Sequence, residues 1–63
     1  MSRNKEYILE FTQVGNSVKV SAVDPITTAE AVIVGSLSAT REELSELAIK
    51  KLEYVLAKIK SQS

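Results

Sequence analysis

The stretch TREELSELAIKKLEYVLAKI, residues 40–59, predicts one long amphipathic helix on which the rest of the fold depends. Thr40 and Glu43 have the spacing of a capping box, in which each side chain bonds the backbone N–H of the other residue. Glutamates fill the first turns and lysines the later ones, an order that complements the helix dipole. Because no glycine or proline interrupts the run, we expect one continuous helix over residues 40–59.

One face of this helix is apolar when successive residues are placed about 100° apart. The central stripe comprises Leu44, Ala48, Leu52, Val55 and Ile59. Four further residues widen it, Leu47 and Tyr54 on one side and Ile49 and Leu56 on the other. The resulting arc of about 200° is wider than the roughly 100° that packing on one sheet needs. The helix therefore either exposes a few aliphatic side chains or places one side against a second chain.

The composition argues against most catalytic chemistry. The chain has 63 residues, eight basic and eight acidic side chains, and neither cysteine nor histidine. Without these two residue types the common nucleophile and base pairs cannot be assembled, and a structural zinc site lacks its usual ligands. We therefore predict that the chain is not an enzyme and holds no metal or cofactor. Its length predicts one small domain over residues 1–63, which packing or oligomerisation must stabilise.

Two alternating runs, residues 7–14 and 17–23, predict a β-hairpin around the Gly-Asn pair at residues 15–16. Glycine at the first central position suits a type II′ two-residue turn. Such a turn fixes the strand register and sets Phe11 opposite Val20. In this register the large apolar side chains share one face of the sheet, so the turn and the hydrophobic pattern agree.

A turn and a third strand complete the predicted sheet. Residues 24–28 contain an Asp-Pro pair typical of turns, and the apolar run 29–34 follows as a strand. The predicted fold class is α+β, a three-stranded antiparallel meander with one C-terminal helix packed on one face (β-β-β-α). Residues 1–5 and 61–63 are polar and are expected to fray. The expected core comprises Leu9, Phe11, Val18, Val20, Ala22, Ala31, Ile33, Leu44, Leu47, Ala48, Leu52, Val55 and Ile59.

Aliphatic residues outside this core indicate an interface. The sheet face away from the helix would carry several of them, which is unusual on the surface of a monomer. The third strand is an edge whose only charge is Glu30, and such an edge invites pairing with another strand. The candidate interface comprises Ile8, Val23, Val32, Val34, Ile49 and Leu56. The expected partner is a second copy, in a homodimer, or an unidentified protein.

Several short segments resemble a known family. Residues 14–20 read VGNSVKV, residues 22–25 read AVDP, residues 33–35 read IVG and residues 51–56 read KLEYVL. This wording resembles a family of short uncharacterised alphaproteobacterial proteins, a domain of unknown function with VGNxVKVxAxDP…IVG and KLEYVL motifs. The family pattern has glycine where this chain has Thr28, a substitution that makes a left-handed turn residue less comfortable. The resemblance supports the fold and implies no activity and no site.

We predict a non-enzymatic protein-interaction module that self-associates. The alternative is a small nucleic-acid-binding protein that uses the lysines of the helix, although a net charge near zero argues against phosphate binding as its main task. No membrane partner is expected, because the helix lysines form no basic band and its glutamates would repel anionic lipids. The polar first residues do not resemble a signal peptide, so we expect a cytoplasmic protein.

Overall fold

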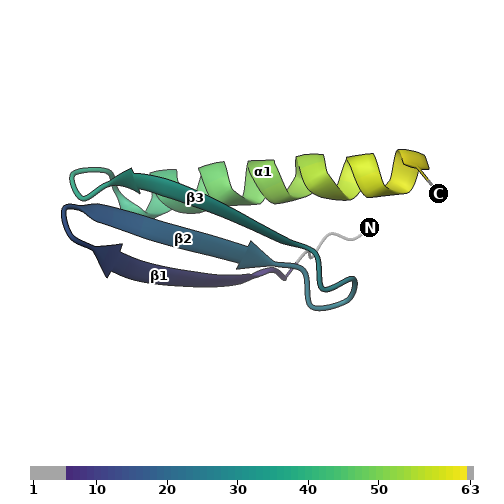
Figure 1. Cartoon of the computed structure of the whole chain (residues 1–63), viewed down its shortest axis with the longest axis horizontal. Helices are drawn as coiled ribbons and strands as arrows, with labels where there is room; N and C mark the ends of the chain where they lie inside the picture. The colour runs from purple at the N-terminus through teal and green to yellow at the C-terminus, as the bar shows by residue number, and fades with distance from the viewer. Residues whose placement is uncertain (1–5, 63) are drawn as a thin grey trace.

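A three-stranded antiparallel sheet and one helix make up the chain in the computed structural model, which describes residues 6–62 (Figure 1). The elements are β1 (Ile8–Val14), β2 (Ser17–Val23), β3 (Glu30–Ser36) and α1 (Arg41–Gln62). The sheet order is β1-β2-β3, so β2 is central and the other two strands are edges. The predicted α+β meander with one C-terminal helix on the sheet is confirmed. The helix runs three residues past its predicted end at residue 59, and the fraying expected of residues 1–5 and 63 lies outside the described part.

The turn between β1 and β2 sets the register of the hairpin. Gly15 has a φ of +60°, and Thr28 is the only other described residue with a positive φ, so Asn16 lies in the ordinary region. This combination is that of a type II′ turn, as predicted. Phe11 pairs with Val20, and the remaining pairs follow from it. The predicted register is therefore confirmed along the whole hairpin.

The connection between β2 and β3 is a tight loop that forces one residue into left-handed backbone geometry. The Thr28 N–H donates to the Asp24 carbonyl at 2.7 Å, and the Asp24 N–H donates to the Ala29 carbonyl at 2.9 Å. The Asp24 carboxylate also accepts the N–H of Ile26 at 2.8 Å. Thr28 closes the loop with a φ of +63°. This conformation is strained for a β-branched residue.

Replacing this threonine in Thr28→Gly is expected to stabilise the chain by about 0.5–1 kcal/mol. The left-handed conformation costs an ordinary residue about 1–2 kcal/mol, and the added flexibility of glycine offsets only part of that gain. The matched control is Thr27→Gly, because Thr27 has no positive φ and its hydroxyl accepts the N–H of Ala29 at 3.2 Å. Urea unfolding should show stabilisation for Thr28→Gly and destabilisation for Thr27→Gly. Equal loss in both variants would contradict the assigned strain.

The core lies between α1 and the half of the sheet formed by β2 and β3. Its buried apolar residues are Val20, Ala22, Ala31, Leu44, Ala48 and Leu52. Small side chains on both layers let the helix approach the sheet closely, and Gly35 leaves room for Leu44. Tyr7, Leu9 and Phe11 of the β1 segment are larger and only partly buried at the border of the core. The helix therefore lies over β2 and β3, with β1 farthest from it (Figure 1).

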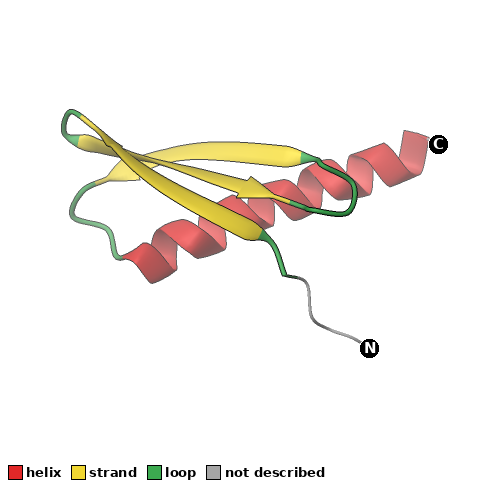
Figure 2. Ribbon diagram, turned by 90° about the horizontal axis from the view of Figure 1, so that it is seen from below, coloured by secondary structure: helices red, strands yellow, loops and turns green. Residues whose placement is uncertain are grey.

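Two residues predicted for the core are exposed, Leu47 at 54% and Ile59 at 51%. The buried row of the helix runs through Leu44, Ala48 and Leu52 at a spacing of four, which turns by about 40° per step and carries the row away from Leu47. Ile59 is exposed for a different reason. The 22-residue helix is about 33 Å long and the seven-residue strands about 24 Å, so the C-terminal turns run past the sheet (Figure 2).

Candidate interaction surface

One backbone carbonyl on the edge of β3 is bound by a side chain from the helix. Lys51 Nζ donates to the carbonyl oxygen of Val32 at 2.9 Å. A lysine on the rim of an edge strand is one of the devices that prevent pairing with a foreign strand. Glu30 is the only charged residue of β3 itself, and Lys51 brings a second charge to this edge from another element. Lys51 therefore hinders the pairing of another strand at the middle of β3.

On the opposite edge of the sheet, no described side chain binds the outward backbone groups of β1. Val14 and Ser17 flank a two-residue turn, so they form a hydrogen-bonded pair and the pattern alternates from there. The backbone groups of the odd-numbered residues Leu9, Phe11 and Gln13 then point outward, away from β2. No described side chain donates to or accepts from them. Within the described part of the chain, this strand presents unpaired N–H and C=O groups along its length, which is the arrangement that strand addition requires.

The sheet face away from the helix collects part of the predicted interface. Ile8 and Val34 are 52% and 68% exposed, and Val23 and Val32 are partly buried on the same face. Val14, 59% exposed, shares this face at the far end of β1. The other two predicted residues lie on α1. Ile49 is partly buried, and Leu56 packs against the core. The structure therefore brings the four strand residues together and places the two helix residues on a separate surface.

A groove of about 760 Å³ opens where the helix runs past the sheet. Its apolar lining comes from Tyr7, Pro25, Ile26, Leu56, Ala57 and Ile59. Three carboxylates also line it, those of Glu6, Asp24 and Glu53. The hydroxyl of Tyr7 donates to Glu53 Oε2 at 3.4 Å across the groove. No lysine or arginine is among the described lining residues, so this part of the groove combines apolar walls with carboxylates.

Sequence patterns did not identify this groove, although one signal pointed toward it. Ile26 follows an Asp-Pro pair in the middle of a turn, where polar residues are usual. Its side chain is 89% exposed. A large aliphatic residue at such a position has no role in the core. Only the three-dimensional structure shows that the end of the helix lies beside this turn.

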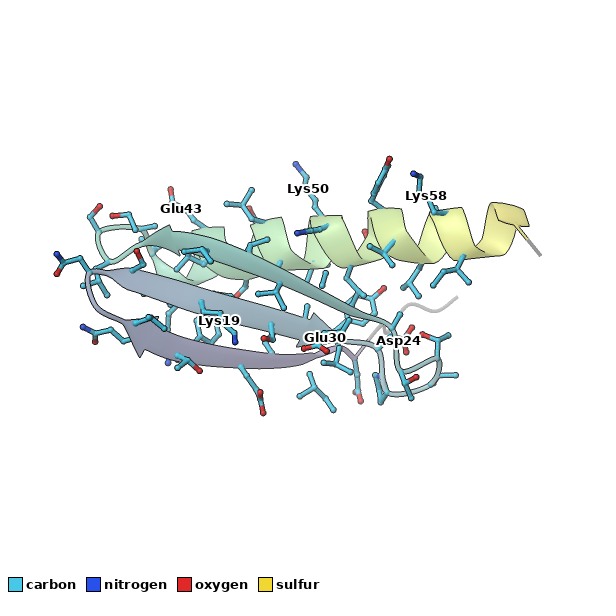
Figure 3. The ribbon with its side chains drawn as sticks, viewed as in Figure 1. Lys19, Asp24, Glu30, Glu43, Lys50 and Lys58 are labelled. Atoms are coloured by element: carbon cyan, nitrogen blue, oxygen red, sulfur yellow. The ribbon has the colours of Figure 1, made fainter. Side chains whose placement is uncertain are left out.

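The lysines whose side chains the structure describes do not form one basic surface. Lys50 and Lys58 point from α1 away from the sheet (Figure 3), and Lys58 Nζ lies 5.4 Å from the centre of the Tyr54 ring. Lys19 is exposed on the uncovered face of β2, and Lys51 is held at the β3 edge. These positions offer no continuous track for a phosphate backbone.

The described residues show no cluster of potential metal ligands. Within residues 6–62 no three acidic side chains are placed to hold a metal ion together. No helix in the described part of the chain is both long and apolar enough to cross a membrane. The features that remain are an open strand edge, an uncovered sheet face and an acidic groove.

Together the fold and these surfaces define a small α+β protein of β-β-β-α order, with one sheet face covered by its helix. A family model described as Domain of unknown function (DUF6898) matches residues 4–59, most of the chain. The chain belongs to this family, in agreement with its resemblance to an uncharacterised domain family. No curated protein and no solved structure matches it.

Proposed function

We propose that the chain is a non-enzymatic protein-interaction module that self-associates by pairing β1 with β1 of a second copy. The observation that carries this proposal is the difference between the two sheet edges. Lys51 occupies the β3 edge, whereas the outward backbone groups of β1 meet no described side chain. Unpaired backbone groups on an edge strand are a template for another strand. We place this assembly in the cytoplasm, the setting expected from the sequence.

The midpoint of β1 favours one antiparallel register. Full-length pairing of a strand over Ile8–Val14 with itself puts Phe11 on the twofold axis. Ile8, 52% exposed, then lies opposite Val14 of the second copy, which is 59% exposed. Glu10 lies opposite Thr12 of the second copy. A shift of two residues would instead oppose Glu10 to its own copy, and like charges directly opposite are destabilising.

The resulting assembly would be a six-stranded sheet with both helices on one face. It satisfies the backbone groups of the open edge and brings the exposed aliphatic residues at the two ends of β1 together. The uncovered faces of the two sheets would become continuous. The remaining predicted interface residues on this face, Val23, Val32 and Val34, would then be available for further contacts.

Gln13→Pro tests the pairing, because this substitution removes one outward N–H from each copy. Proline is tolerated on an edge strand where its missing N–H faces solvent. Each hydrogen bond contributes about 1 kcal/mol, so losing two should weaken the dimer about 30-fold. Sedimentation equilibrium over a wide concentration range measures this change. Circular dichroism and urea unfolding of the same samples report whether the monomer stays folded.

Two control variants sharpen the result. Thr12→Pro removes an N–H that faces β2 and should destabilise the folded monomer itself. Val34→Lys adds a charge at the β3 edge and should leave self-association through β1 unchanged. A monomeric wild-type protein at all concentrations would refute the proposal. Weaker association in Val34→Lys with none of the loss in Gln13→Pro would move the interface to the opposite edge.

A further inference from the structure

We propose that the acidic groove at the C-terminal end of α1 binds a basic peptide segment that presents an aliphatic or aromatic side chain. This is a second surface, distinct from the β1 edge. With the exception of Tyr7, its lining comes from the turn between β2 and β3, from Glu6 and from the end of the helix. The two sites can therefore be tested separately.

The walls of the groove select for an apolar side chain. Ile26 and Ile59 are 89% and 51% exposed, and both line the groove with the partly buried Leu56. Two large aliphatic side chains exposed beside one concavity are typical of a site that buries a partner's anchor residue. Small-molecule sites bury most of their ligand within a cleft. The exposed rim of this groove fits a longer chain that continues beyond it.

The charge of the groove selects for lysine or arginine beside that anchor. Among the described residues, Glu6, Asp24 and Glu53 line it and no lysine or arginine does, so the described lining favours a cationic partner. The carboxylates are not placed to hold a metal ion within the described residues. A peptide ammonium or guanidinium group is the positive charge that fits this spread of carboxylates. Electrostatic complementarity of this kind gives specificity and faster association.

A fluorescent peptide of alternating leucine and lysine residues is the probe, and a matched peptide with glutamate in place of lysine is its control. Fluorescence anisotropy with the full chain measures affinity at low and at physiological salt. Two-dimensional NMR spectra locate the binding site. We expect the basic peptide to bind, with shifts at Ile26, Leu56 and Ile59, and the acidic peptide to show no binding.

Variants on the helix and in the turn between β2 and β3 test the site. Each replaces an exposed side chain, so the fold should be retained. Glu53→Lys should weaken binding about tenfold, because it replaces an attractive charge with a repulsive one. Glu46→Lys has the same change in net charge, lies outside the groove on the same helix, and should change affinity less than twofold. Ile26→Ser should weaken binding about fivefold through lost apolar contact. Circular dichroism spectra check that each variant remains folded.

Several outcomes would overturn the proposal. Equal binding of the acidic peptide would show that charge does not select the partner, and equal loss in Glu46→Lys and Glu53→Lys would reduce the effect to net charge. Binding shifts confined to β1 would assign the peptide to the strand edge. Groove resonances that shift with protein concentration alone would assign the groove to a second copy. Absence of binding at low salt would remove the site. Apart from the concentration-dependent shifts, none of these results bears on self-association through β1, which Gln13→Pro tests independently.

Discussion

Leu52→Ala is expected to leave a large fraction of the molecules unfolded under conditions in which the natural sequence is folded. Leu52 is fully buried and is one of the two largest such side chains, with Val20. Truncating a buried leucine to alanine costs about 2–5 kcal/mol. A domain of 63 residues has a total stability of about 3–9 kcal/mol. The loss therefore approaches the whole free energy of unfolding.

Urea unfolding followed by circular dichroism measures this loss, at one fixed protein concentration because association shifts apparent stability. The matched control is Leu47→Ala, the same substitution on the same helix. Leu47 is 54% exposed, so its truncation should cost less than about 1 kcal/mol. Similar losses in the two variants would mean that Leu47 also packs against the sheet, which would contradict the orientation of the helix described above.

The hairpin and the start of the helix were predictable from sequence because short-range chemistry determines both. The Gly-Asn turn at residues 15–16 leaves one register in which the apolar side chains share a face. The capping box is equally local. The N–H of Thr40 donates to Glu43 Oε1 at 3.0 Å, and the N–H of Glu43 donates to the Thr40 hydroxyl at 3.1 Å. In both cases the interacting residues are close in sequence, so spacing alone identifies them.

The position of the helix across the sheet was not predictable in this way. The arc of apolar residues on the helix allows several orientations, and placing the sheet at its centre wrongly buried Leu47. The contact between Lys51 and Val32 spans 19 positions in sequence and depends on the side of the helix that faces β3. The groove likewise depends on how far the helix runs past the strands. These features follow from packing between elements, which residue spacing does not encode.

Residue size explains the position of the helix on the sheet. Three buried side chains between the helix and the sheet are small, Ala22 and Ala31 on the sheet and Ala48 on the helix. The strand β1 contributes the larger Leu9 and Phe11. Close approach is possible only over the small residues. The helix therefore shifts toward β3, where Lys51 reaches the edge, and away from β1, which stays open. The same packing preference thus protects one edge and exposes the other.

Gly35→Ala is expected to disturb this arrangement at the point of closest approach. A Cβ atom at Gly35 would overlap the Cδ2 atom of the buried Leu44. Overpacking of this kind costs about 1–3 kcal/mol, and the better strand propensity of alanine returns less than about 1 kcal/mol of it. Urea unfolding should therefore show net destabilisation. Leu44→Val removes the overlapping atom, so its combination with Gly35→Ala should cost less than the sum of the two single changes.

Gly15→Ala is the control that separates overlap from backbone strain. Gly15 has a φ of +60°, and an added Cβ there meets no atom within 4 Å, so the loss of stability arises from conformation alone. Its cost should add to that of Leu44→Val without coupling, since distant sites behave independently. If Gly35→Ala and Leu44→Val are also additive, the helix does not approach β3 at this residue. The close approach that brings Lys51 to the β3 edge would then lose its support.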